Sequence, residues 1–333
     1  MILHPSIIAL FLSSVLISML LLYSSYYGLL ILRKWDIKSG SELQLDLERR
    51  TYLISTILTY VFGFQLISLF LYVYTADLLH PLFVGAMCAS GTLTVNSYGY
   101  PTLILKVFNF ITAGLWLVLN YTDSRACDYP LIKNKYKFLI VIAPLVVAET
   151  FLQANFFLGL KPDIITSCCS TLFTSDSTSV ASDLASVPNI PGKIAFYTLI
   201  VVTLSSGVYF YLKGGGGYVF SLLCGISFVM GIISIISFFS LYYYELPSHH
   251  CPFDILHKEY YYVGYPLYLC LFGGAVAGMG TGVLMPYRKA PSLMEIIPVI
   301  QKRLIIFALV CFLIFTVMVT YKIVSTPFKL EGY

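Results

Sequence analysis

The sequence predicts an all-α integral membrane protein, a polytopic bundle of about eight transmembrane helices. Hydrophobic residues make up 58% of the 333 residues, charged residues only 11%, and the mean hydropathy is +0.84. A soluble domain carries about 25% charged residues. We therefore expect a single membrane domain over residues 1–333 with the lipid bilayer as its main partner. The net charge of +4 does not indicate nucleic-acid binding, because the basic residues are arranged as topology signals.

Eight apolar runs are long enough to cross a bilayer, which requires about 20 residues. The first run is too long for a signal-peptide core and lacks a small-residue cleavage site, so we interpret it as a helix. A glycine run at 214–217 predicts a tight turn between the fifth and sixth spans. The eight predicted spans are residues 7–32, 52–79, 102–120, 138–160, 194–212, 218–242, 264–285 and 304–324.

Three connections have distinctive sequences. Arg33–Arg50 is charged and its leucines alternate, so we expect a surface-lying, solvated connector rather than a helix. His80–Pro101 is moderately apolar but interrupted by glycines, which favours a membrane-surface or re-entrant loop covered by protein. Lys161–Gly192 is the longest polar insertion and contains the adjacent pair Cys168 and Cys169.

The basic residues predict the orientation. Connections 1–2, 3–4, 5–6 and 7–8 hold 14 of the 20 Lys and Arg residues. The positive-inside rule makes that face cytoplasmic and places both termini outside. With no cleavable leader, this pattern fits a bacterial inner membrane with periplasmic termini. Four cysteines, Cys88, Cys168, Cys169 and Cys251, then fall on the outer, oxidising face.

The segment Glu245–Tyr262 concentrates polar chemistry between two apolar spans. It holds three of the five histidines, a cysteine and three acidic residues. Cys251-Pro252 predicts a helix start, where the helix dipole would lower the pKa of the thiol.

The first hypothesis for this segment is a soft-metal site. His249, His250, Cys251 and Asp254, with Cys168 and Cys169, offer the imidazole, thiolate and carboxylate ligands that suit copper or zinc. The spacing is not that of a two-pair zinc motif. The structural alternative is a disulfide joining Cys168 or Cys169 to Cys251 or Cys88, with the histidines at the interface.

The second hypothesis is thiol–disulfide exchange. Cys251–Glu259 (CPFDILHKE) resembles the Cys-x-x-Cys element of the quinone-linked disulfide-forming enzymes and the related vitamin K epoxide reductase family, with Asp254 in place of the second cysteine. The resemblance implies a four-helix core, a bound quinone and a catalytic Cys251. It also implies that electrons pass from a loop cysteine pair to the cysteines of this element. Because Asp254 stands where the second cysteine would be, Cys251 would have to exchange with Cys168, Cys169 or Cys88.

Other roles stay open. The chain is also interpretable as a non-catalytic subunit or scaffold, or as a transporter component. It would contact other membrane subunits through Gly274, Gly278 and Gly282, whose spacing allows close helix approach. A periplasmic thiol protein or metal carrier is a further expected partner. A haem b held by His80 and either His249 or His250 is another alternative.

Two charges fall inside predicted spans. Lys106 and Glu149 are costly in lipid, so we expect them to face each other or to join a polar cluster with Asn109, Gln153 and Asn155. Such a group serves either as a proton or ion path or as a structural ion pair.

Overall fold

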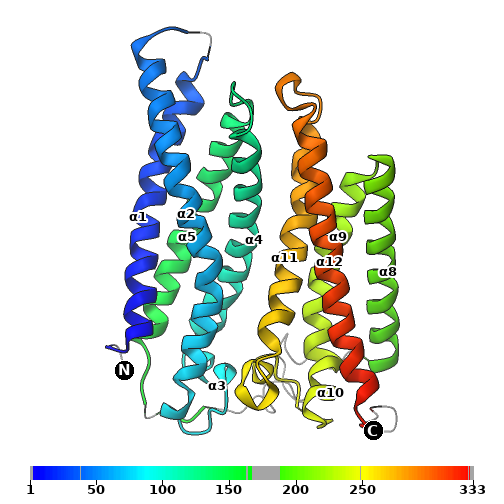
Figure 1. Cartoon of the computed structure of the whole chain (residues 1–333). Coiled ribbons are helices and arrows are strands. Elements are labelled where there is room, and N and C mark those ends of the chain that lie inside the picture. Colours follow the sequence, from blue (N-terminus) through cyan, green and yellow to red (C-terminus); the bar gives the residue numbers. More distant parts are fainter. Residues whose placement is uncertain are drawn as a thin grey trace. The chain divides into compact units, whose positions relative to one another are not determined.

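The computed structural model describes residues 3–37, 39–162, 164–166, 188–247, 249–328 and 330. Eight helices within these residues are long and apolar enough to cross a membrane, which confirms the predicted class (Figure 1). They are α1 Pro5–Lys34, α2 Glu42–Leu78, α4 Gly99–Asp123, α5 Ile132–Leu158, α8 Asn189–Lys213, α9 Gly217–Ser234, α11 Gly264–Leu284 and α12 Ile296–Ser325.

Several helices extend past the apolar runs that predicted them. The clearest difference is α2, which begins at Glu42, so the expectation of a non-helical connector up to Arg50 is wrong. Hydropathy marks the part of a helix suited to lipid, whereas helical hydrogen bonding continues into polar sequence. The ion pair between Arg50 and Asp46, four residues apart, supports this polar first part of α2.

The described residues form two compact units, each considered by itself. Unit 1 comprises residues 1–75, 95–161 and 286–300, and unit 2 comprises residues 76–94, 162–285 and 301–333. In unit 1, α5 packs against α1 and α4. Trp116, Phe62 and Tyr136 belong to its buried core.

Unit 2 is built around α9 and α11. Helix α9 packs against α8 and α11, and it follows α8 through the predicted glycine turn. Gly214 and Gly216 have φ angles of 68° and 83°, which favour glycine. After Ser234 the chain continues as a π-helical segment, Ile235–Phe239, and as α10, Ser240–Tyr244.

The His80–Pro101 region contains two short helical elements before α4 begins. They are a 3₁₀ turn at His80–Leu82 and α3, Ala89–Leu93, whose five residues are all buried. The segment is thus covered by protein at α3, where a polar backbone would be costly in lipid.

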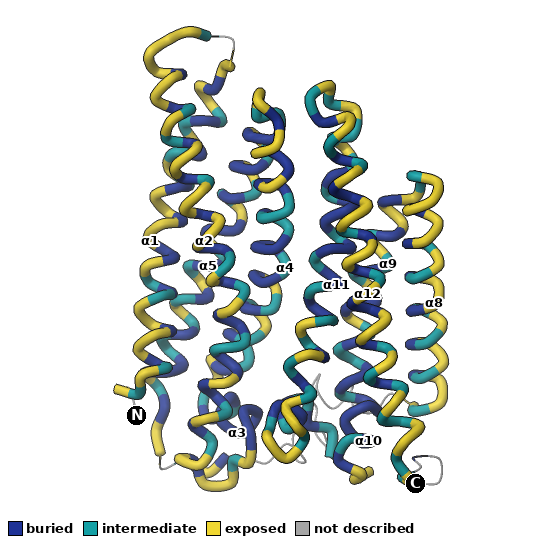
Figure 2. Tube along the Cα trace, viewed as in Figure 1, coloured by how far each residue is buried: buried dark blue, intermediate teal, exposed yellow. Residues whose placement is uncertain are grey.

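The outward faces of the long helices are exposed and apolar (Figure 2). Examples are Leu12 in α1, Ile104 in α4 and Leu212 in α8, which are 57%, 67% and 71% exposed. Faces of this kind are stable when they contact lipid chains. The chain is therefore an integral, multi-pass membrane protein.

Candidate metal and thiol site

Two cysteines from separate connections, Cys88 and Cys251, lie side by side within unit 2. Their Sγ atoms are 3.4 Å apart, and the two side chains are 1% and 0% exposed. Cys88 immediately precedes α3, and Cys251 lies in the connection between α10 and α11. Because 163 positions separate them in the sequence, only the tertiary fold brings them together.

Asp254 completes a group of three metal-ligating side chains. One ligand atom from each of Cys88, Cys251 and Asp254 lies within 4.8 Å of the others. The Cys251 thiol donates a hydrogen bond to Asp254 Oδ1 at 3.3 Å, and the His249 ring pairs with Asp254 Oδ2 at 2.5 Å. A carboxylate between a thiol and an imidazole can accept a proton from either side.

The charge of Asp254 is set by opposing effects. Burial favours its neutral acid, but hydrogen bonds from His249, Cys88 and Cys251 outweigh burial, so the pKa of Asp254 lies below its usual value. The carboxylate is therefore ionised at neutral pH.

Two tyrosines hold the Cys251 loop. The Tyr244 hydroxyl donates to the Cys251 carbonyl at 2.6 Å and accepts from the Ile255 amide at 3.0 Å. The Tyr268 hydroxyl, from α11, donates to the Pro252 carbonyl at 2.6 Å. These hydroxyls therefore restrict the positions of Cys251 and Asp254.

A second carboxylate–imidazole pair, Asp77 and His257, lies next to Cys88. Asp77 Oδ1 lies 2.7 Å from His257 Nε2 and accepts a hydrogen bond from the Ala89 amide at 3.1 Å. The His80 ring stacks on His257 at 5.9 Å between centroids. Asp77 thus connects the start of α3, next to Cys88, to the loop that carries Cys251.

Sequence reasoning missed the role of Asp77. The only signal was an acidic residue at the end of an apolar span, on the same predicted face as the histidines. Hydrogen bonding to Asp77 raises the pKa of His257, against the opposing effect of burial.

His250, one of the predicted metal ligands, contacts the backbone of the preceding helical segment. Its Nδ1 donates to the Ile236 carbonyl at 2.9 Å, within the π-helical segment Ile235–Phe239. A π-helical segment interrupts the regular i→i−4 ladder, so its carbonyls are open to such donors. Burial lowers the pKa of His250, which favours a neutral ring at this contact.

The predicted helix start at Cys251-Pro252 is wrong. Residues 251–253 are loop, followed by a 3₁₀ turn at Asp254–Leu256, and the long helix α11 begins only at Gly264. A three-residue turn has no appreciable macrodipole, so the predicted dipole effect on the thiol is absent. Cys168 and Cys169 lie outside the described residues.

The predicted glycine contact surface for another subunit is filled by this chain itself. A Cβ at Gly278 would lie 2.3 Å from Cys224 Sγ, and one at Gly282 would lie 2.3 Å from Ser221 Oγ, both in α9. A Cβ at Gly274 would lie 3.2 Å from Cys311 Cβ of α12, which is a tight contact. Close helix approach is confirmed, but the partner is intramolecular.

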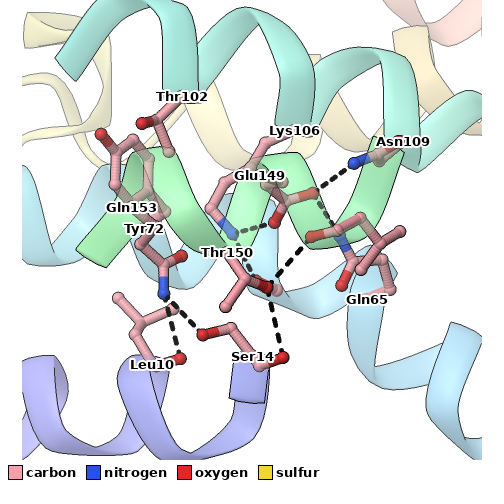
Figure 3. Close-up of polar contacts among 12 residues, drawn as sticks. Leu10, Ser14, Gln65, Tyr72, Thr102, Lys106, Asn109, Glu149, Thr150 and Gln153 are labelled. Carbon is pink, nitrogen blue, oxygen red and sulfur yellow. Dashed lines mark hydrogen bonds and ion pairs between the residues drawn. The ribbon is translucent and has the colours of Figure 1, made fainter. Parts of the chain in front are cut away.

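In unit 1, Lys106 and Glu149 form the buried ion pair that their position inside spans predicts. Lys106 Nζ lies 2.6 Å from Glu149 Oε1, and their side chains are 1% and 2% exposed (Figure 3). Asn109 and Gln65 also donate to the carboxylate, each at 2.6 Å. Asn155 does not join the cluster, because its amide donates to the Phe151 carbonyl of its own helix.

Comparison of the chain with known protein families, with characterised proteins and with solved structures finds no match in any of the three.

Proposed function

We propose that this protein is an envelope membrane accessory protein that binds a soft transition-metal ion, copper(I) or zinc, through Cys88, Cys251 and Asp254. The observation that carries the proposal is the convergence of two buried thiols and a carboxylate within 4.8 Å. Thiolates are the ligands that select soft and borderline metals, and burial keeps competing water away.

The spacing of the sulfur atoms suits a single bound ion. With metal–sulfur bonds of about 2.3 Å, two sulfur ligands at a tetrahedral ion lie about 3.8 Å apart. The observed Sγ–Sγ distance is 3.4 Å, so the thiols need to separate by only a few tenths of an ångström. A disulfide of about 2.05 Å requires a larger movement.

The number of ligands that each ion requires distinguishes copper(I) from zinc. Binding releases both thiol protons, leaving two thiolates and the Asp254 carboxylate around the ion. Copper(I) can bind stably to the two thiolates and the carboxylate alone. A zinc ion usually has four ligands in a tetrahedron and would need a fourth. Water, or a thiolate from the Cys168–Cys169 pair, has the right chemistry for that fourth position.

His249 has a supporting role in this proposal. Its pairing with Asp254 Oδ2 leaves Oδ1 as the oxygen that would bind the ion. In the structure, Oδ1 accepts the hydrogen bond from the Cys251 thiol. Such outer partners of a ligand typically change metal affinity about 10–100-fold when they are removed.

Metal loading of the detergent-purified protein tests the proposal. Elemental analysis after exposure to copper(I) or zinc, followed by desalting, is expected to show one ion per chain that is lost in Cys88→Ser and Cys251→Ser. Cys127→Ser is the matched control, since Cys127 is exposed in the loop between α4 and α5. Full loading of both serine variants would contradict the proposal, provided that their unfolding temperatures match the wild type.

The same thiols favour a second candidate, reversible disulfide formation coupled to a quinone. Its specific support is the thiol–thiol contact at 3.4 Å beside a proton-accepting carboxylate. In this step the two S–H bonds break and one S–S bond forms. The two electrons and two protons pass to the quinone, which becomes a quinol, with Asp254 relaying the Cys251 proton.

Thiol counting with and without reductant separates the two candidates. A Cys88–Cys251 disulfide in the purified protein, together with a quinone reduced in step with thiol oxidation, favours the redox function. Peptide mapping identifies the bonded cysteines. A protein with neither a bound metal nor a reducible bond at this site would instead be a non-catalytic subunit or scaffold.

A further inference from the structure

The buried polar network of unit 1 is more extensive than a structural ion pair requires. The Glu149 carboxylate accepts three hydrogen bonds, from Lys106 at Oε1 and from Gln65 and Asn109 at Oε2, each at 2.6 Å. The Lys106 ammonium also donates to Ser68 Oγ at 2.7 Å. Side chains from three helices, α2, α4 and α5, therefore surround one acidic group.

The network lies deep within the helices. Glu149 is nine residues from the C-terminal end of α5, a distance of about 14 Å at 1.5 Å per residue. Half the hydrocarbon thickness of a bilayer is about 15 Å. Ionisable groups at this depth are costly, and they commonly mark ion or proton pathways.

Two acceptors in this region lack donors. Asn109 Oδ1 and Gln153 Oε1 are buried and have no hydrogen-bond partner among the described residues. Both residues are 0% exposed. The Asn109 amide nitrogen already donates to Glu149. A ligand that donates a hydrogen bond to Asn109 Oδ1 would therefore be linked to the Glu149 carboxylate through the Asn109 side chain.

Gln153 extends the polar path toward α1. It lies one helical turn after Glu149 on α5, and its amide donates to the Leu10 carbonyl at 3.0 Å and to Ser14 Oγ at 3.2 Å (Figure 3). Thr150, between them in sequence, also donates to the Ser14 carbonyl at 3.2 Å. The polar side chains thus continue from the ion pair across the face between α5 and α1.

The chemistry of the unsatisfied groups defines the ligand. Amide oxygens accept only, so the missing ligand must donate hydrogen bonds. A metal cation is disfavoured, because Lys106 already supplies a positive charge to the carboxylate. Water is a neutral donor, and buried water typically bridges such polar groups.

We propose that Lys106 and Glu149 form a hydrated intramembrane proton-exchange site, with water bound to Asn109 Oδ1 and Gln153 Oε1. In uptake, an O–H bond of a hydronium ion in the bound water breaks and an O–H bond forms on Glu149, so its carboxylate becomes a neutral acid and the ion becomes water. Release to water breaks that bond, and no electrons move. Among the described residues, the titratable groups that face Glu149 are Lys106 of α4 and Tyr72 of α2. The polar groups that α1 contributes to the contact with Gln153 are the Ser14 side chain and the Leu10 carbonyl.

Infrared difference spectroscopy in lipid nanodiscs tests this inference. Difference spectra between acidic and alkaline buffers are expected to contain a carboxylic-acid C=O band that is absent in Glu149→Gln. Asp123→Asn is the matched control, because Asp123 also forms a fully buried ion pair in unit 1, with Lys135 at 2.8 Å. That variant is expected to keep the band.

Hydrogen–deuterium exchange of the same band tests the water path. Gln153→Leu is expected to slow exchange at Glu149 about tenfold, the effect of losing about one hydrogen bond along the path. Asn155→Leu, on the same helix but with its amide bonded to the Phe151 carbonyl, is expected to leave the rate unchanged. If Gln153→Leu does not fold, Asn109→Leu replaces it.

Two results would contradict the proposed proton-exchange site. The absence of any Glu149-dependent band over the pH range, or equal exchange rates in wild type and Gln153→Leu, makes the pair purely structural. The inference is independent of the cysteine site, since serine variants of Cys88 and Cys251 leave every group in this network in place.

Discussion

At the residue scale, two carboxylate–imidazole pairs organise the candidate site in different ways. Asp254 pairs with His249 and also contacts the Cys251 thiol, so it takes part in the proposed chemistry. Asp77 pairs with His257 and accepts from the Ala89 amide, so it holds two segments together. The first pair is expected to affect metal binding, and the second to affect the stability of the site.

The His257–Asp77 pair predicts a pH-dependent stability. Because the pKa of His257 is raised in the folded state, its stabilisation is fully present below the unfolded pKa of about 6.5 and is lost as the pH rises through the folded value. His257→Gln should therefore lower the free energy of unfolding at acidic pH by no more than about 1 kcal/mol, because the two side chains are still 20% and 21% exposed. The unfolding temperature in detergent measures this loss. The difference should disappear at alkaline pH.

His250 provides the control with the opposite sign. Burial lowers its pKa in the folded state, so its protonation at acidic pH favours unfolding. His250→Gln is expected to improve relative stability as the pH falls through about 6.5. The same pH profile for both variants would show that the two assignments are wrong.

The Lys106–Glu149 pair predicts a strong asymmetry between single and double variants. Lys106→Met leaves a buried carboxylate without its cation, and breaking a buried pair in this way costs about 3–5 kcal/mol. Lys106→Met combined with Glu149→Met removes both charges and should recover most of that loss. Thermal unfolding in detergent measures the stability of both variants. If the double variant lost as much stability as the two single variants together, that result would contradict the pairing.

At the element scale, the span that contains α11 is more buried than the other long spans described in unit 2. The most apolar part of this span is 61% buried, compared with 28% for the span of α8. Its glycines allow α9 to approach so closely that a single methyl group at Gly278 would overlap both the Sγ and the Cβ of Cys224. Packing of this kind, through small residues, replaces the hydrophobic effect as the driving force inside a membrane.

Gly278→Ala is therefore expected to destabilise the protein by about 1–3 kcal/mol, the usual cost of overpacking. Gly273→Ala is the matched control on the same helix, because its Cβ would make ordinary contact with Phe307 at 3.4 Å. Adding Cys224→Gly to Gly278→Ala should restore part of the lost stability. An unfolding temperature for Gly278→Ala equal to that of Gly273→Ala would contradict this packing.

At the scale of the whole molecule, the distribution of basic residues predicts which ends of the helices face the cytoplasm. Cys127 follows α4 in a connection predicted to be inner, and Glu245 follows α10 in one predicted to be outer. Both residues are exposed.

A membrane-impermeant maleimide measures this orientation. In intact cells it should label Glu245→Cys and not Cys127, and in inverted vesicles the pattern should reverse. Mass spectrometry of the labelled peptides identifies each cysteine. Labelling of Cys127 from outside would invert the topology and place the candidate site on the cytoplasmic face.

Hydropathy alone predicted all eight long helices, because lipid accepts only segments that satisfy their backbone internally and present apolar side chains. It missed the polar start of α2, since helix propensity there continues beyond the lipid-suited run. The positions of Lys106 and Glu149 inside predicted spans also indicated that the two charges would pair or join a polar cluster. Gln65 and Ser68, from α2, were not foreseen as their partners, because an uncharged polar residue in a span carries little signal.

The sequence by itself determined that this is a multi-pass helical membrane protein, and that the connection after α10 is rich in potential ligands. Only the tertiary structure decided that Cys88 and Asp77 meet Cys251, Asp254 and His257, and that the glycines of α11 face α9. The physical reason is that hydropathy and periodicity are local properties of the chain. Convergence of side chains 163 residues apart instead depends on how whole helices pack.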